Sequence, residues 1–275
     1  MGQSARRLRW RLNSTRHKFR IGAVSYLNTV PLVWGMLHGE QREQVDLSFS
    51  LPSECARQLE SGQLEVGLVP VAEITRQRLE IVPGVGIACF GPVRSILLFS
   101  RVPWRKVQTV AADLGSRTSV QLARIILAER FGVEPEITAQ EPRLEDMLAQ
   151  SDAALIIGDP ALRLDPQSLP YEHLDLGDEW RKLTGLPMVF AAWAGRQPAP
   201  GLARITTASY EFGSTHIDEI IESEYGKRGV TRALAETYLR HHIRFVLGEK
   251  EMEGLRTFVQ WAGLEKTDAY ATTGS

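Results

Sequence analysis

Hydrophobic and polar residues alternate along this 275-residue chain in short blocks that predict strands followed by helices. The first block, residues 19–24, is an apolar run typical of a buried parallel strand. Small polar residues follow it. Pro31, which a helix tolerates only in its first turn, predicts a helix that begins near Asn28 and covers about 30–38. Unpaired backbone N–H groups at that helix start would favour an anion, unless the segment is an ordinary strand-to-helix turn.

The alternation continues through residues 45–100 and predicts an α/β fold. The expected elements are strands over 45–50 and 66–69, a helix from Pro52 to about Gly62, and two extended segments over 83–100 that break at Gly91-Pro92. Repeated strand–helix–strand units are typical of a parallel sheet wound with crossover helices. The two extended segments indicate a backbone that leaves one domain for another.

A second α/β set repeats this layout after residue 100. The expected elements are strands over 107–112, 134–138 and 153–157, helices over 120–131 and 144–149, a further helix after Gly158-Asp-Pro160, and an apolar crossing run over 189–193. Amphipathic helices are expected near 201–223, 231–246 and 249–262, with Gly248 and Gly263 as terminators.

Two crossings of the chain, near residues 100 and 190, predict two lobes joined by a two-stranded hinge. The predicted first lobe consists of 19–100 plus 195–275 with the C-terminal helices, and the second lobe of 101–194; residues 1–18 are expected to form a disordered basic segment. A cleft between lobes is the default ligand site of such folds.

Charge and cysteine content favour a small-molecule partner. The chain has 32 basic and 33 acidic residues and a net charge of -1, so it has no field to attract nucleic acid or an anionic membrane. Cys55 and Cys89 lack metal-ligand spacing and suit a reducing compartment as small buried residues. The arginines of residues 1–20 are not followed by an apolar run, and no segment approaches about 18 uninterrupted apolar residues, so we expect a cytoplasmic protein.

Three polar turns, each between a strand and a helix, carry the candidate ligand contacts: 25–29, 116–119 and 158–159. Helix N-termini in both lobes would suit a ligand with two anionic ends, because each end can accept backbone N–H groups. The side-chain donors would be Asn28, Ser95, Thr118 and Ser119. The alternative is that Thr29, Ser119 and Asp159 are only helix caps and that Arg94, beside Ser95, is a solvated surface charge.

Missing motifs and missing bases restrict the chemistry. The chain has no Gly-x-Gly-x-x-Gly, phosphate-loop, Gly-x-Ser-x-Gly or His-Glu-x-x-His motif, which argues against nucleotide-dependent, acyl-transfer and zinc-hydrolase activities. Its six histidines lie outside the polar turns, and Asp159 is the only carboxylate within them. A reaction here would need to be easy once the substrate is positioned, or to use a base that the substrate supplies.

Six short motifs in the right order resemble the chorismate dehydratase family. They are Ser25-Tyr-Leu-Asn-Thr with Pro31, Leu68-Val-Pro70, Gly91-Pro-Val-Arg-Ser95, Ser116-Arg-Thr-Ser119, Ile157-Gly-Asp-Pro-Ala161, and Asp175-Leu-Gly with Trp180 and Thr184-Gly-Leu-Pro187. The resemblance covers about 19–195, is looser through the C-terminal helices, and leaves 1–18 unexplained. Glu65, where the family has aspartate, and Ala72-Glu73-Ile74, where an aromatic residue is usual, depart from the pattern at positions that we interpret as structural.

The resemblance implies a two-lobed fold like that of periplasmic binding proteins of the second type. It also implies dehydration of chorismate to 3-[(1-carboxyvinyl)oxy]benzoate, without cofactor or metal, at the start of the futalosine route to menaquinone. The implied substrate-binding residues are Ser25, Tyr26, Asn28, Ser95, Thr118, Ser119 and Asp159, with Asn28 as a catalytic positioning donor. Because the hydroxyl and amide groups are weak bases, the proton acceptor would be the enolpyruvyl carboxylate of the substrate, with Asp159 as the alternative.

Two other functions are compatible with this pattern. The later enzyme of the same pathway, 1,4-dihydroxy-6-naphthoate synthase, resembles this chain in fold, although the motifs at 25–28 and 116–119 favour the dehydratase. A non-catalytic solute-binding protein would use the same two lobes for transport, and the lack of an export signal counts against it. Incubation of the purified protein with chorismate distinguishes the three.

Overall fold

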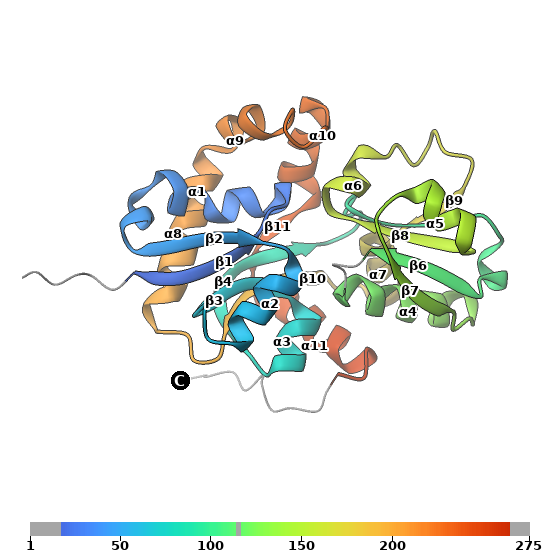
Figure 1. The fold of residues 1–275 in the computed structure, drawn as a ribbon, viewed down its shortest axis with the longest axis horizontal. Coiled ribbons are helices and arrows are strands. Elements are labelled where there is room, and N and C mark those ends of the chain that lie inside the picture. Colours follow the sequence, from blue (N-terminus) through green and yellow to red (C-terminus); the bar gives the residue numbers. More distant parts are fainter. Residues whose placement is uncertain (1–17, 114–116, 265–275) are drawn as a thin grey trace, which may run out of the picture.

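The computed structural model describes residues 18–113 and 117–264, which form two β-sheets with helices packed on them (Figure 1). The larger sheet has six strands in the order β11-β4-β10-β3-β1-β2 and the smaller has five in the order β7-β6-β8-β5-β9. The strands of the larger sheet are β1 (Phe19–Val24), β2 (Val45–Ser50), β3 (Val66–Pro70), β4 (Glu80–Cys89), β10 (Met188–Gly195) and β11 (Arg244–Leu247). Those of the smaller sheet are β5 (Ile96–Ser100), β6 (Thr109–Asp113), β7 (Glu136–Gln140), β8 (Ala153–Ile157) and β9 (Glu172–Asp175).

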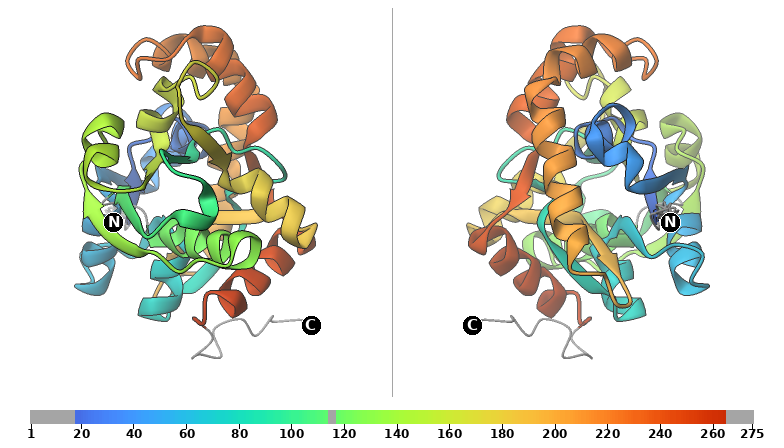
Figure 2. Two further views of the ribbon diagram at one scale, coloured as in Figure 1. Left: turned by 90° about the vertical axis from the view of Figure 1, so that its right-hand side faces the viewer. Right: turned by 90° about the vertical axis from the view of Figure 1, so that its left-hand side faces the viewer.

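Each sheet with its helices forms one lobe, and the side views show the helices on both faces of the sheets (Figure 2). The helices of the first lobe are α1 (Val30–His38), α2 (Pro52–Glu60), α3 (Val71–Gln77), α8 (Gly201–Thr215), α9 (Ile217–Glu224), α10 (Arg232–Thr237) and α11 (Glu249–Trp261). Those of the second lobe are α4 (Arg117–Phe131), α5 (Leu144–Gln150), α6 (Gly158–Arg163) and α7 (Leu176–Thr184). Short 3-10 turns cover Leu27–Thr29, Glu40–Glu43 and Trp104–Lys106, and a π-helical turn covers Tyr238–His242.

The first strand–helix–strand unit forms as its apolar pattern predicts. β1 pairs in parallel with both β2 and β3, and its last four residues are buried. α2 lies close against this sheet because Gly22 and Gly67 leave room for it: a Cβ on either glycine would lie 2.9 Å from Cys55 Sγ of α2. Cys55 of α2 fills this space and is fully buried, and Cys89 is fully buried as well, so the expectation of small buried thiols is confirmed.

The chain crosses between the sheets earlier than the predicted boundaries at residues 100 and 194. β5 pairs with β8 and β9 in the smaller sheet, whereas β10 pairs with β3 and β4 in the larger one. The first crossing is therefore the segment 90–95, and the second precedes Met188. An apolar run such as 96–100 fits either sheet, and only its pairing partners decide between them.

The C-terminal part differs most from the sequence-based prediction. A helix over 231–246 was expected, but α10 ends at Thr237 and residues 244–247 form β11, which pairs with β4 at the edge of the larger sheet. Alternating burial along Arg244–Leu247 is typical of an edge strand. The elements α3, β9 and α7 were not predicted. Residues 1–17, to which most of the predicted basic segment belongs, and Ser116 lie outside the described residues.

Candidate active site

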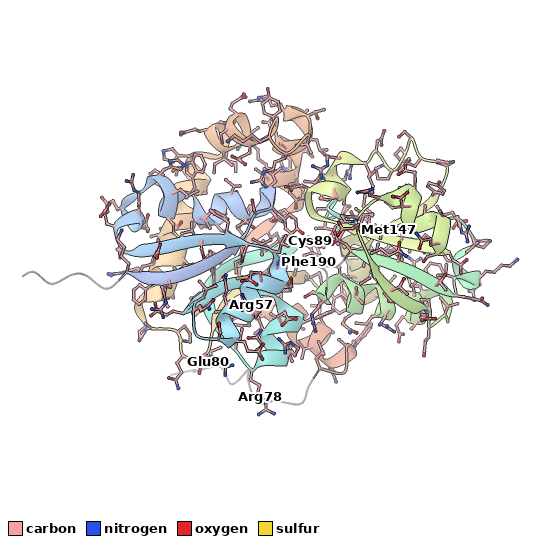
Figure 3. All side chains as sticks on the ribbon, in the orientation of Figure 1. Arg57, Arg78, Glu80, Cys89, Met147 and Phe190 are labelled. Carbon is pink, nitrogen blue, oxygen red and sulfur yellow. The ribbon has the colours of Figure 1, made fainter. Side chains whose placement is uncertain are left out.

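A pocket lies between the two lobes at the ends of the strands and near both crossings. Both lobes line it, with residues Val24, Tyr26, Asn28, Thr29, Pro52, Leu68, Pro70, Ile87, Val93, Ser95, Ile96, Thr118, Ser119, Ile157, Gly158, Phe190 and Ala191. Figure 3 labels one of them, Phe190, near the junction of the two lobes. Apolar side chains dominate the walls, and the polar groups are hydroxyls and one carboxamide. None of these lining residues is acidic, basic or a histidine.

The first-lobe side of the pocket is built by the turn between β1 and α1. The Asn28 side-chain amide Nδ2 donates to the Tyr238 hydroxyl at 2.9 Å, and that hydroxyl donates to Ser95 Oγ at 2.9 Å. Asn28 Oδ1 and Thr29 Oγ1 are buried and have no hydrogen-bond partner among the described residues. Thr29 precedes α1 but makes no side-chain capping bond, so the helix-cap alternative for it is wrong. Both atoms belong to residues that line the pocket, where a bound ligand could satisfy them.

The second-lobe side is built by the first turn of α4. The side chains of Thr118 and Ser119 are buried and line the pocket, so this helix presents its N-terminal turn to it. Thr118 Oγ1 accepts from the backbone N–H of Ala72 at 3.1 Å, across the lobes. The hydroxyl hydrogen of Thr118 remains available to a ligand because a hydroxyl both donates and accepts.

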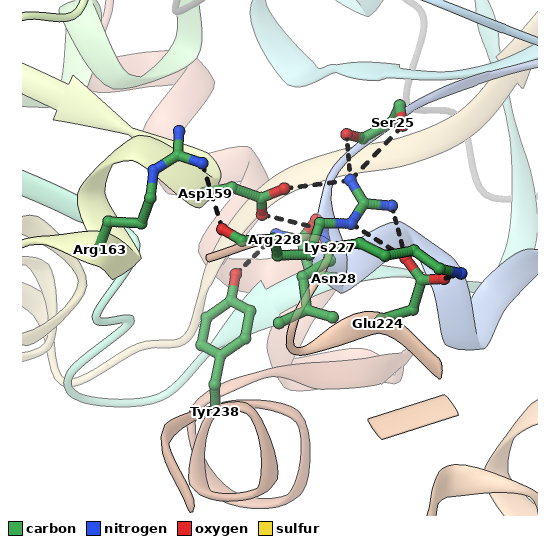
Figure 4. A network of polar contacts seen from close by, with 9 residues as sticks. Ser25, Asn28, Asp159, Arg163, Glu224, Lys227, Arg228 and Tyr238 are labelled. Atoms are coloured by element: carbon green, nitrogen blue, oxygen red, sulfur yellow. Dashed lines mark hydrogen bonds and ion pairs between the residues drawn. The ribbon is translucent and has the colours of Figure 1, made fainter. Parts of the chain in front are cut away.

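Asp159, the carboxylate of the third polar turn, is engaged by the first lobe (Figure 4). Its Oδ1 accepts from the backbone N–H of Leu27 at 3.0 Å, and its Oδ2 lies 3.1 Å from the Arg228 guanidinium. Arg228 also donates to the backbone oxygen of Ser25 at 2.7 Å and pairs with Glu224 at 2.9 Å. Both oxygens of Asp159 thus have partners that join the lobes, and its side chain does not line the pocket.

Gly158, beside Asp159, gives Tyr26 its place in the pocket. The φ of Gly158 is +62°, and a Cβ at this position would lie 2.7 Å from Tyr26 Cε1. Glycine is therefore favoured here both by the left-handed backbone and by the close approach of the Tyr26 ring. The backbone N–H of Gly158 donates to the backbone oxygen of Ser95 at 2.8 Å. Burial, followed by the charges of Asp113 and Asp159, raises the pKa of Tyr26 to about 12. Tyr26 therefore stays protonated at neutral pH.

Arg94 has a structural position behind the pocket. Its guanidinium donates to the Ala161 oxygen at 3.0 Å and also bonds the Leu164 oxygen, so it holds the C-terminal carbonyls of α6. Burial lowers the pKa of Arg94. The backbone N–H groups of Val93 and Arg94 bond the carboxylate of Asp175 and hold the first crossing against β9, and the same carboxylate caps the start of α7. The alternative of a solvated surface charge at Arg94 is wrong.

Most of the predicted contact residues meet at this pocket. Tyr26, Asn28, Ser95, Thr118 and Ser119 line it, whereas Ser25 and Asp159 lie beside it and share Arg228. The assignment of these residues to substrate binding stays a prediction. Sequence reasoning missed Tyr238, which lies inside the predicted helix 231–246, and Arg228, which lies in the short connection before that helix; neither belongs to a local motif. Within the described ranges no cluster of three or more histidine, cysteine, aspartate or glutamate side chains could hold a metal ion, and no helix is long and apolar enough to cross a membrane.

Comparison with known proteins identifies the family. Residues 19–263 match a family model described as menaquinone biosynthesis. The chain belongs to this family. A chorismate dehydratase of Thermus thermophilus is 30% identical over 264 residues, covering 89% of this chain and 95% of the relative. A chorismate dehydratase of Campylobacter jejuni is 24% identical over 244 residues, covering 87% and 95%. The predicted family resemblance is thereby confirmed.

Solved structures confirm the predicted fold class. A protein of Archaeoglobus fulgidus superposes with a TM-score of 0.71 at 16% identity, covering 90% of this chain and 98% of that one. The periplasmic aliphatic sulphonate binding protein SsuA of Escherichia coli gives a TM-score of 0.62 at 16% identity, covering 90% and 91%. This member of the menaquinone biosynthesis family thus has the two-lobed fold of periplasmic binding proteins.

Proposed function

We propose that this protein is a lyase that dehydrates chorismate to 3-[(1-carboxyvinyl)oxy]benzoate in menaquinone biosynthesis, on the futalosine route. The observation that carries the proposal is the pocket itself, in a chain whose named relatives are chorismate dehydratases. One wall has orphaned polar atoms on Asn28 and Thr29, and the opposite wall is the first turn of α4. The two free buried cysteines suit a reducing compartment and support a cytoplasmic location.

Substrate binding would use both sides of the pocket. The N-terminal turn of α4 and the hydroxyls of Thr118 and Ser119 favour one carboxylate of chorismate. The hydroxyls of Ser95 and Thr29 are donors for polar groups on the other side. Apolar walls that include Ile87, Ile157 and Phe190 would hold the ring and exclude water, which strengthens every polar contact inside.

The reaction balances within the substrate. The proton on ring C3 leaves, its C–H electron pair becomes part of the aromatic ring, and the C4–O bond breaks as the hydroxyl departs with a proton as water. The intermediate charge would spread onto the ring carboxylate, where helix and hydroxyl donors stabilise it. We assign the proton acceptor to the enolpyruvyl carboxylate, because no lining residue carries a carboxylate or imidazole and both oxygens of Asp159 are engaged.

Direct incubation with chorismate tests the proposal. Purified protein should convert chorismate to an aromatic product with loss of one water, followed by proton NMR and mass spectrometry, and an Asn28→Ala sample serves as the impaired control. Binding without turnover would favour a solute-binding protein instead. A protein that neither binds nor converts chorismate would overturn the assignment. The alternative would then be 1,4-dihydroxy-6-naphthoate synthase of the same pathway.

The proton acceptor is tested separately with a substrate analogue that lacks the side-chain carboxylate. If the substrate supplies the base, the analogue binds to the wild-type protein but does not lose water. A general base contributes about 10²- to 10⁴-fold to a rate, so its removal is easily measured. Normal dehydration of this analogue would exclude the enolpyruvyl carboxylate as the acceptor.

A further inference from the structure

The Tyr238 hydroxyl lies between two side chains of the pocket without lining the pocket itself. It accepts from Asn28 Nδ2 and donates to Ser95 Oγ, each at 2.9 Å, and its side chain is fully buried. Asn28 belongs to the first lobe and Ser95 to the crossing segment that leads into β5. One hydroxyl therefore connects the two parts of the chain that build the pocket wall. Figure 4 shows its contact with Asn28.

The backbone around Tyr238 is held against the crossing segment at a second point. Tyr238 begins the π-helical turn Tyr238–His242, and the His242 ring Nδ1 lies 2.8 Å from the backbone oxygen of Pro92. π-Helical turns are rare and occur often at functional sites. The turn thus places its first and last side chains on the same crossing segment, which makes the position of the Tyr238 hydroxyl well defined.

Hydrogen-bond direction follows from these contacts. A tyrosine hydroxyl has one hydrogen, so when it accepts from Asn28 Nδ2 it gives that hydrogen to Ser95. Asn28 Oδ1 is then left as an acceptor, and it is buried without a partner among the described residues. The Ser95 hydroxyl, whose oxygen is already bonded, keeps its own hydrogen for a ligand. Burial raises the pKa of Tyr238 above its ordinary value, so the group remains a neutral hydroxyl rather than a base.

We infer that Tyr238 is a positioning residue for two side chains. It turns Oδ1 of the Asn28 carboxamide toward the pocket, and it leaves the Ser95 hydroxyl to donate toward the pocket. The inference rests on the proposed function for its substrate. Both carboxylates of chorismate are ionised at neutral pH, and its C4 hydroxyl is then its one O–H donor. The geometry therefore assigns the C4 hydroxyl, the departing group, to Asn28 Oδ1. That contact would hold the scissile C4–O bond in a fixed direction for elimination.

The test is a set of variants assayed with chorismate. Tyr238→Phe keeps the ring and removes the hydroxyl, so kcat should fall about fivefold to tenfold while KM changes by less than about twofold. Tyr210→Phe, which alters a half-buried tyrosine packed on Phe245 outside the pocket, should behave as wild type. In the Asn28→Ala background, Tyr238→Phe should slow kcat by a smaller factor than it does in the wild type, since the hydroxyl acts through Asn28 as well as through Ser95.

Two kinetic outcomes would overturn the inference. One is a wild-type kcat for folded Tyr238→Phe. The other is a loss in the double variant equal to the product of the two single losses, which would mean that Tyr238 acts independently of Asn28. Thermal unfolding of each variant establishes that it is folded before the rates are compared.

A spectroscopic readout separates this inference from the proposed function. In ¹⁵N-labelled protein, the side-chain amide signal of Asn28, identified by its loss in Asn28→Ala, should shift in Tyr238→Phe and stay unchanged in Tyr210→Phe. An Asn28 signal that is identical in wild type and Tyr238→Phe would refute the positioning role. Wild-type protein that fails to convert chorismate, but shows the expected shift, would refute the proposed reaction and leave the positioning role standing.

Discussion

Two turns of the pocket look alike in the sequence but have different surroundings in the structure. Both 25–29 and 158–159 follow a buried strand and carry a polar side chain, the first just before a helix with an early proline and the second in the first turn of one. In the first turn, Asn28 Oδ1 and Thr29 Oγ1 have no partner among the described residues. In the second, both carboxylate oxygens of Asp159 bond groups of the opposite lobe. We therefore expect the first turn to serve a ligand and the second to join the lobes.

The comparison shows that a polar residue at a strand end is only a candidate until its partners are known. A buried polar group without a partner costs free energy, so its persistence is explained by a ligand that satisfies it. A fully bonded group has no such need. Its removal is then expected to change closure and stability more than chemistry.

The largest effect should come from Asn28→Ala in the first turn. Loss of a hydrogen bond to a charged or reacting substrate costs about 1.5 to 3 kcal/mol, which corresponds to about a tenfold to hundredfold loss of kcat. Ser25→Ala is the matched control in the same turn, because the Ser25 hydroxyl lies 3.5 Å from Arg228 and outside the pocket lining. Steady-state kinetics with chorismate measure both. Normal turnover by folded Asn28→Ala would remove this residue from the site.

A smaller effect is expected for Asp159→Asn in the second turn. The amide still accepts from Leu27 N–H but loses the ion pair with Arg228, so KM should rise while kcat stays within about tenfold of wild type. Arg228→Gln should raise KM similarly, and the two changes together should not add. If folded Asp159→Asn binds chorismate without any dehydration, Asp159 is the base. The second turn would then serve the ligand as well as the contact between the lobes.

Closure of the lobes should be visible by small-angle scattering, with a smaller effect. The described contacts between lobes include Asp159 with Arg228, Thr118 with the backbone of Ala72, and Arg117 with Glu73 at 2.7 Å. A non-reactive chorismate analogue should reduce the radius of gyration of wild type, and the ligand-free Asp159→Asn protein should be more open than wild type. An unchanged profile in both comparisons would indicate a rigid, permanently closed cleft.

The smallest effect concerns Tyr26, whose ring lies over Gly158 between the turns. Its pKa is raised to about 12, mainly by burial, from an ordinary value of about 10. The unfolded chain therefore loses this proton first as pH rises, so the stabilising contribution is complete below about pH 10 and is lost through pH 12. Denaturant unfolding at pH 8 and 11 should show a smaller decrease for Tyr26→Phe than for wild type. An equal decrease would mean that Tyr26 titrates alike in both states.

Several features of the fold follow from local pattern. Residues 19–24 and 153–157 are strands as predicted, because apolar runs bounded by turn residues carry their own signal. The turns that line the pocket were also predictable, since the ends of parallel strands meet at one edge of a sheet. The pattern at 231–246 misled, because residues 244–247 become a strand only by pairing with β4. Short segments of this kind have no periodicity long enough to distinguish a helix from an edge strand.

The sequence by itself determined the α/β class, the family and five of the pocket residues, because these depend on motifs and on periodicities within a few residues. Only the tertiary structure decided which polar groups are free. Asn28 meets Tyr238 from 210 positions away, and Asp159 meets Arg228 from 69 positions away. Such contacts leave no local trace in a single chain, since either partner is compatible with an ordinary helix or turn. The division between ligand contacts and lobe contacts therefore arises only when the chain is folded.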